Sequence, residues 1–246
     1  MKWKKLLPAA LWGGVPALGL AAMGLQTLSL RQGYDEKGLF VWTNPAQLAM
    51  MLLCIAAAAG VIALVWKNVP ERGGYAQLFP KSWLRGGVSV LAGVMLALDL
   101  VYSLDPAVMA LRLIGLAAAG CMVFGGVCAG IGCKPHPGFH AVVCVYFLLR
   151  LLTGYRLWGA SAHLEQYALF MITGVLLMLY AFHRCSADAG AIGRRKLILT
   201  GFGAMFGSLT ALAMPGDRVF CLVTVLWVAG SMCCVGPLRR RAGKTA

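Results

Sequence analysis

Long apolar runs alternate with short polar stretches along the whole chain. Each run has roughly the 20 residues that a helix needs to cross a hydrocarbon core about 30 Å thick. The pattern predicts one all-helical transmembrane domain over residues 1–246, with about eight helices at 6–28, 46–66, 88–104, 107–131, 139–153, 164–182, 197–214 and 219–235. The fifth run is the shortest, and it reaches a spanning length if it continues through Arg150 to about Trp158.

The first apolar run follows three lysines, Lys2, Lys4 and Lys5. A basic start before an apolar body is typical of a signal peptide, but this run is longer than the usual apolar region of about 7 to 15 residues. We therefore predict a retained first helix. Cleavage near Ala21 and Ala22 is the alternative, and it would leave seven helices and an outside N-terminus.

Basic residues are divided unequally between the two sides of the predicted membrane. Sixteen Lys and Arg fall on the side that carries both chain ends, and six fall on the other side. The positive-inside rule makes the first side cytoplasmic, and an even number of helices requires both termini to share a side. With Glu71 and Asp188 as its only acids, the inner side carries the whole net charge of +14.

The composition excludes an ordinary soluble domain, because 60% of the residues are hydrophobic and only 12% are charged, against about 25% charged in soluble proteins. The positive charge does not indicate nucleic acid, because its position on the inner face suits anionic lipid headgroups. We expect a multi-pass protein whose partners are the bilayer and its anionic lipids. The short loops favour a bacterial plasma membrane.

The third and fourth runs each carry one charge near the outer end, Asp99 and Arg112. Counting from the turn centre between Asp105 and Pro106 places both charges at equal depth on adjacent antiparallel helices. An ion pair between them is the economical interpretation, because an isolated charge in the bilayer is costly.

The next hairpin repeats this arrangement with Arg150 and Glu165 at equal distances from its turn centre. Ionisable residues at membrane depth usually face a bundle interior or a wet cavity. We therefore predict an outward-opening polar vestibule lined by Asp99, Arg112, Arg150 and Glu165. The structural alternative is that the ion pairs only hold the helices of each hairpin together, or that each charged side chain extends to the membrane interface.

Histidines and cysteines gather toward the cytoplasmic end, in the pattern Cys133-x2-His136-x3-His140 and at His183. Imidazole and thiolate are ligands for zinc, copper or haem, so these four residues are a candidate metal or haem site. Pro135 and Pro137 flank His136, and no second tight Cys/His pair completes the pattern. The ordinary interpretation is interfacial histidines at helix ends, with no cofactor.

The loop after the sixth run is the most distinctive polar stretch, and it holds Arg184, Arg194 and Arg195. These guanidinium groups are candidates for docking a cytoplasmic partner or a lipid phosphate. The alternative is a basic loop that only fixes orientation. The glycine pairs Gly126/Gly130 and Gly203/Gly207 have the GxxxG spacing of closely packed helices, within the chain or in a homodimer.

Three functions fit these patterns. The first is a transporter of a small molecule or lipid with an outward-facing vestibule. The second is a non-enzymatic membrane subunit or scaffold that docks partners through basic cytoplasmic loops, and the third is a membrane haem or metal protein. The sequence has no Walker A loop, G-x-S-x-G or HExxH motif, which favours a non-catalytic role.

Overall fold

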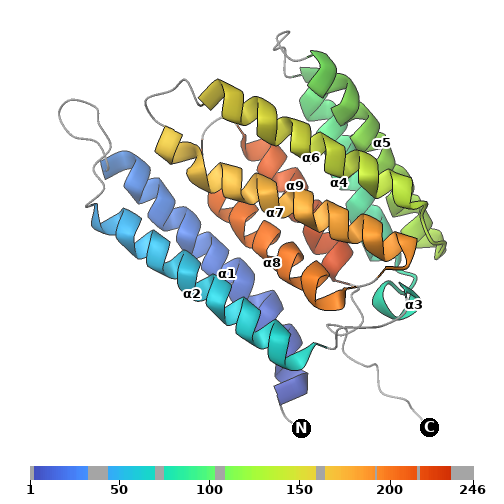
Figure 1. The fold of residues 1–246 in the computed structure, drawn as a ribbon, viewed down its shortest axis with the longest axis horizontal. Helices are drawn as coiled ribbons and strands as arrows, with labels where there is room; N and C mark the ends of the chain where they lie inside the picture. Colours follow the sequence, from blue (N-terminus) through green and yellow to red (C-terminus); the bar gives the residue numbers. More distant parts are fainter. Residues whose placement is uncertain are drawn as a thin grey trace.

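The structure is a computed structural model of the chain, and it describes residues 3–32, 44–69, 75–102, 109–158, 164–191, 193–214 and 217–233. These residues form helices and short connections, without a strand (Figure 1). The helices are α1 (Trp3–Gln32), α2 (Pro45–Asn68), α3 (Tyr75–Leu78), α4 (Trp83–Tyr102), α5 (Met109–Ile131), α6 (Pro137–Trp158), α7 (Leu164–Ala189), α8 (Arg194–Ala211) and α9 (Arg218–Met232).

Six helices, α1, α2 and α4 to α7, contain segments that are long and apolar enough to cross a membrane, and α9 is a shorter apolar helix. The all-helical class is therefore confirmed for the described residues, and it fits a membrane-embedded bundle. The number of membrane crossings and the cytoplasmic position of both termini stay predictions. Helix α6 reaches Trp158, as the longer alternative for the fifth run required.

Local sequence signals mark several helix ends. Asn44 accepts a hydrogen bond from the Ala46 amide at 2.9 Å, and Pro45 occupies the first turn of α2, where its missing amide proton costs nothing. Gly132 follows α5 and Gly190 follows α7, with φ of +93° and +95°. This left-handed conformation suits glycine, so each residue turns the chain directly into the next connection.

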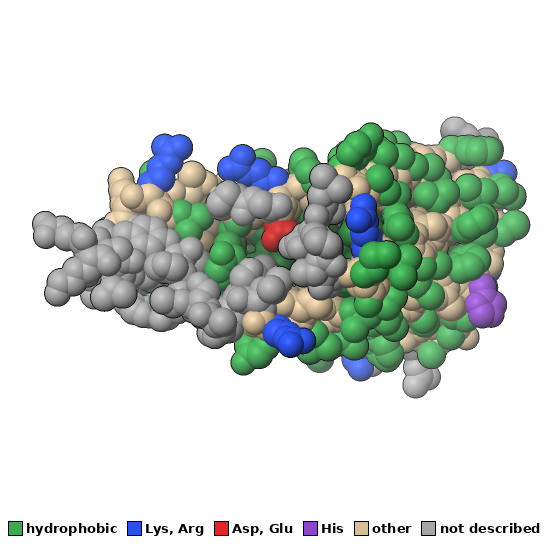
Figure 2. Space-filling model, turned by 90° about the horizontal axis from the view of Figure 1, so that it is seen from above, with side chains coloured by type: hydrophobic (Ala, Val, Ile, Leu, Met, Phe, Trp, Pro, Cys, Tyr) green, Lys and Arg blue, Asp and Glu red, His purple; other side chains and the backbone are tan. Residues whose placement is uncertain are grey.

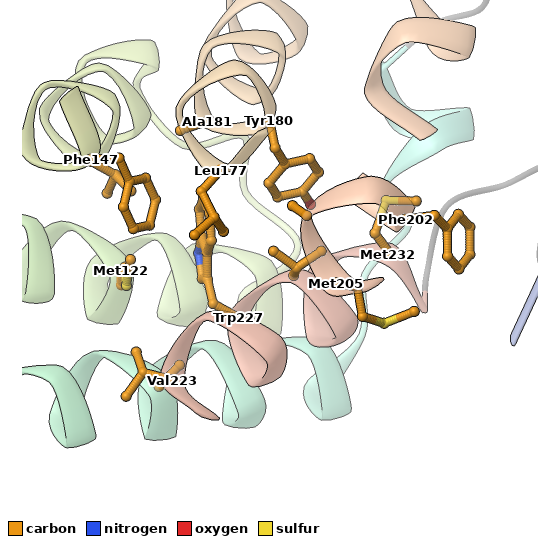
Figure 3. Close-up of a cluster of buried hydrophobic side chains, with 14 of the residues drawn as sticks. Met122, Phe147, Leu177, Tyr180, Ala181, Phe202, Met205, Val223, Trp227 and Met232 are labelled. Carbon is orange, nitrogen blue, oxygen red and sulfur yellow. The ribbon is translucent and has the colours of Figure 1, made fainter. Parts of the chain in front are cut away.

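The helices pack mainly as antiparallel hairpins, α1 with α2, α4 with α5, and α6 with α7 (Figure 1). Helix α9 lies against α4 and α8, while the α1–α2 hairpin packs on α8. The fully buried Trp227 of α9 stands between Phe147 and Tyr180 in the middle of the bundle (Figure 3). Helices α4, α6, α7 and α9 therefore enclose a common interior.

The outer surface is rich in large hydrophobic side chains, including Leu52 and Ile55 on α2 and Phe124 on α5. On the face shown in Figure 2, hydrophobic side chains cover much of the surface and charged ones are scattered. Such a surface suits lipid and would be a liability in water. The pattern supports a bundle that contacts lipid around its sides.

The α4–α5 hairpin owes its close approach to glycine. A Cβ added at Gly126 would lie 2.8 Å from the Gly86 carbonyl oxygen, and one added at Gly86 would lie 2.7 Å from the Gly126 carbonyl oxygen. A Cβ at Gly207 of α8 would likewise lie 2.5 Å from Thr173 Oγ1 of α7. Both predicted GxxxG segments therefore serve packing within the chain.

Candidate functional site

The outer ends of α4, α6 and α9 share a charged cluster, which we call the outer cluster: Asp99, Tyr146, Arg150 and Asp217. Arg150 of α6 forms an ion pair and a hydrogen bond with Asp217, the residue before α9. Its Nη1 donates to the Tyr146 hydroxyl at 3.5 Å, and its guanidinium carbon lies 3.8 Å from the centroid of the Phe220 ring. Asp99 of α4 lies within electrostatic range of Arg150 and Asp217.

The structure corrects the predicted pairing of Asp99 with Arg112. Arg112 Nη2 donates instead to the carbonyl oxygen of Val101 at 2.6 Å, and no ion pair links these two described side chains. Val101 lies in the last turn of α4, whose carbonyls have no partner within the helix, so a nearby guanidinium satisfies one of them. Of the predicted vestibule residues, the structure brings together Asp99 and Arg150.

The remaining vestibule residue, Glu165, belongs to α7, but its side chain lies outside the described residues. Its pairing with Arg150 therefore stays a prediction. Asp217, which the sequence analysis did not select, supplies the carboxylate that Arg150 contacts. Its position directly before an apolar helix was the available signal, because an acidic side chain is favourable at a helix N-terminus.

A second charged group lies at the opposite end of the same helices, and we call it the inner cluster: Arg85, His140, Arg184 and Asp188. His140 Nδ1 of α6 lies 2.5 Å from Asp188 Oδ2 of α7. Arg85 belongs to the first turn of α4, and Arg184 lies one turn before Asp188 on α7. All four residues are buried. Burial makes these charges depend on partners inside the protein.

The two arginines of the inner cluster stack on one aromatic ring. The guanidinium carbons of Arg184 and Arg85 lie 3.5 Å and 4.7 Å from the centroid of Phe79, which directly follows α3. Tyr75 of α3 packs against Phe79 at 5.3 Å between ring centroids. Helix α3 and Phe79 therefore cover the inner cluster.

Aromatic side chains fill the interior between the two clusters. Trp227 lies 6.2 Å from His140, 5.7 Å from Phe147 and 5.3 Å from Tyr180, measured between ring centroids. Phe147 in turn lies 6.1 Å from Phe220, the ring that contacts Arg150. This aromatic layer separates clusters that are about 15 Å apart along α6, because ten residues at 1.5 Å separate His140 from Arg150.

The predicted metal ligands do not form a site. In the part of the chain that the structure describes, no three His, Cys, Asp or Glu side chains are placed to share a metal ion. His136 Nδ1 accepts a hydrogen bond from the Gly138 amide at 3.1 Å, and Cys133 is exposed. His140 contacts Asp188 inside the bundle, whereas the ring of His183 lies tilted beside that of Phe182, at 5.6 Å between centroids. Their spacing in the sequence suggested a shared site, but in the structure each of the four side chains has different neighbours.

The three predicted docking arginines have different environments. Arg184 and Arg194 are buried, so little of either side chain is accessible to a partner. Arg195 is half-buried, donates from Nε to the Val69 carbonyl oxygen at 2.8 Å, and lies over the Trp66 ring at 5.5 Å. Its contacts join the start of α8 to the end of α2. Docking of a partner at these residues stays a prediction.

An apolar groove of about 460 Å³ lies between α2 on one side and α7 and α8 on the other. Its lining includes Ile55, Ile62, Ile172 and Phe206. These side chains suit acyl chains and offer no means of binding a polar solute. The groove is separate from both charged clusters. Comparison of the chain with protein-family models, curated proteins and solved structures finds no match in any of the three.

Proposed function

We propose that the protein is a membrane carrier for a small polar solute, which it passes between the outer and inner clusters. One observation carries this proposal: α4, α6 and the helices beside them place partly buried charges at one end of a common interior, buried charges at the other end, and an aromatic layer between them. Ionisable residues inside membrane bundles commonly mark the path of a substrate.

The two clusters differ in access. The Arg150 and Asp217 side chains remain 18% and 31% exposed, whereas the His140 and Asp188 side chains are 9% and 0% exposed. The outer cluster is therefore the more open in this conformation. A carrier of this form exchanges solute with the outside while α3 and Phe79 close the inner end, and it opens the inner end in a second conformation.

The charged clusters and the aromatic layer have complementary roles in such a carrier. A polar solute entering the bundle loses its water, and the outer cluster offers hydrogen-bond donors and acceptors that replace that water. The aromatic layer prevents a continuous water path between the two clusters. Solute then crosses only when the helices rearrange around it, which separates a carrier from an open channel.

The first experiment is native mass spectrometry of the protein extracted gently from its own membrane. We expect a stoichiometric small molecule, and vesicles that contain the protein should then take up that same molecule. Arg150→Gln should reduce uptake at least 10-fold with unchanged protein abundance, whereas the lipid-facing change Leu52→Val should not. A stoichiometric protein partner without a bound solute would contradict the carrier and support the membrane-subunit alternative.

A further inference from the structure

The inner cluster has more buried positive than negative charge. Arg85 and Arg184 are 4% and 1% exposed, and Asp188 is 1% exposed. With His140 neutral, these groups sum to one positive charge. A buried charge without a counterion is strongly unfavourable in a low-dielectric interior. Among the described side chains, the group therefore lacks one negative charge to balance it.

The hydrogen bonds of Arg184 also indicate a missing anionic partner, independently of the charge count. Arg184 Nε and Nη1 are buried and have no hydrogen-bond acceptor. Buried donors are nearly always paired in native proteins, and a buried guanidinium is among the most costly donors to leave unpaired. Two donors on one guanidinium form a planar fork that matches two oxygens of a carboxylate or phosphate.

The nearest carboxylate on the helix does not fill this role. Asp188 lies four residues after Arg184 on α7, a spacing at which ion pairs commonly form on helices. It contacts His140 instead, and no ion pair joins it to Arg184 among the described side chains. The Arg184 guanidinium lies instead against the Phe79 ring, which the Arg85 guanidinium also contacts.

Phe79 contacts both arginines without neutralising them. The face of an aromatic ring attracts a cation but carries no net charge. Phe79 and Tyr75 come from the short segment around α3, at the inner end of the bundle, so displacement of this segment would open the space between the guanidinium groups to the cytoplasm (Figure 1). An anion can then take the place of the ring as the group that both arginines contact.

We propose that Arg85 and Arg184 form a binding site for a singly charged oxyanion, of the carboxylate or phosphate-ester class, which enters from the cytoplasmic side when Phe79 moves aside. This assignment rests on the proposed carrier function and names its class of substrate. The same chemistry is present in a soluble anion and in the phosphodiester of an anionic lipid headgroup.

Calorimetric titration of the purified full chain tests the site, in a detergent and chloride buffer free of other oxyanions. One arm uses acetate and inorganic phosphate, and a second uses vesicles of phosphatidylglycerol compared with phosphatidylcholine. Binding in the first arm identifies a soluble anion, and binding only to phosphatidylglycerol identifies a lipid headgroup. Either result supports the site only if the binding depends on the two arginines. If no binding is detected in either arm, the proposed site is overturned.

Substitutions establish that dependence. Arg184→Gln should weaken binding at least 10-fold, Arg184→Lys should weaken it less because the charge remains without the fork, and the exposed control Lys196→Gln should leave it unchanged. Phe79→Leu should tighten binding several-fold, because the ring that competes with the anion is removed. If Arg184→Gln fails to fold, Arg184→Lys and Phe79→Leu still decide the matter, and unchanged affinity in both overturns the site.

Uptake into vesicles separates this inference from the proposed function. Anion binding that depends on Arg184 without any uptake would overturn the carrier and leave the site intact. Uptake of a solute by the protein, with anion binding absent or insensitive to Arg184→Gln, would overturn the oxyanion site and leave the carrier intact.

Discussion

Three polar residues of α7, Tyr180, Arg184 and Asp188, recur at intervals of four and are all buried. This spacing places them on one face of the helix, one above the other. The face is directed into the bundle, where Tyr180 shares a hydrogen bond with Ser231 of α9 and Asp188 contacts His140 of α6. A single polar stripe therefore joins α7 to two neighbouring helices.

Tyr180→Phe tests the contribution of this stripe to stability. The change removes the hydroxyl that pairs with Ser231, while Ser231 keeps its 3.0 Å hydrogen bond to the Val228 carbonyl oxygen. We expect a loss of about 1 kcal/mol in the free energy of unfolding, measured by denaturation in mixed micelles. The exposed Tyr155→Phe on α6 should have almost no effect, and equal effects of the two changes would contradict the prediction.

The Arg150–Asp217 pair predicts that removing one partner destabilises the protein more than removing both. Asp217→Asn leaves a half-buried guanidinium without its carboxylate and should destabilise the protein by about 1 to 2 kcal/mol, a value reduced by the partial exposure of both side chains. The double variant with Arg150→Gln should recover part of this loss. The measurement is a double-mutant cycle on unfolding, and strictly additive effects would show that the two residues do not interact.

At this scale the sequence identified Asp99 and Arg150 as site candidates but did not select Asp217, Arg85 or Asp188, and it gave His140 and Arg184 other roles. Turn counting predicts depth in the membrane and leaves the direction of a side chain around its helix undetermined. Arg112 has the expected depth, yet it contacts a carbonyl oxygen at the end of α4. Arg85 and Asp188 were assigned to cytoplasmic segments because a charge ordinarily ends an apolar run, and only their contacts show that they lie inside the bundle.

Among the elements, the α4–α5 hairpin is a contact in which glycines bring the backbones of two helices directly against each other. The predicted boundaries differ most where charges are buried: α4 begins at Trp83 rather than residue 88, and α7 continues to Ala189 rather than residue 182. Both extensions carry residues of the inner cluster. Hydropathy could predict that these helices exist. It could not predict that Phe79 would contact the two arginines and His140 would contact Asp188, so that charged helical turns are buried.

A pair of glycines on α5 tests the hairpin contact with a matched control. Gly126→Ala places a methyl group against the backbone of α4 and should cost about 1 to 3 kcal/mol of unfolding free energy, since neither helix can shift without disturbing its other contacts. Gly120→Ala meets nothing within 4 Å and should be neutral or stabilising by up to about 1 kcal/mol, because alanine favours the helix. Equal losses at both positions would contradict the proposed contact.

For the whole molecule, the alternating helices and the charge distribution make one prediction about orientation. Cys133 is exposed on the connection between α5 and α6, which the charge distribution assigns to the cytoplasm. A variant that keeps Cys133 and replaces the other cysteines with serine should react with a membrane-impermeant thiol reagent only after the cells are opened. Labelling of intact cells would reverse the predicted topology.

The attachment of the α1–α2 hairpin to α8 has a consequence for biosynthesis. The hairpin is joined to the remaining helices mainly through α8, by contacts such as Trp12 with Phe202 and Arg195 with Val69. About 125 residues separate the end of α2 from the start of α8, so a ribosome adding about 5 to 20 residues per second needs roughly 6 to 25 s to supply that partner. During this interval the newly inserted hairpin must survive in lipid as an isolated pair, exposed to proteolytic surveillance and to assembly factors.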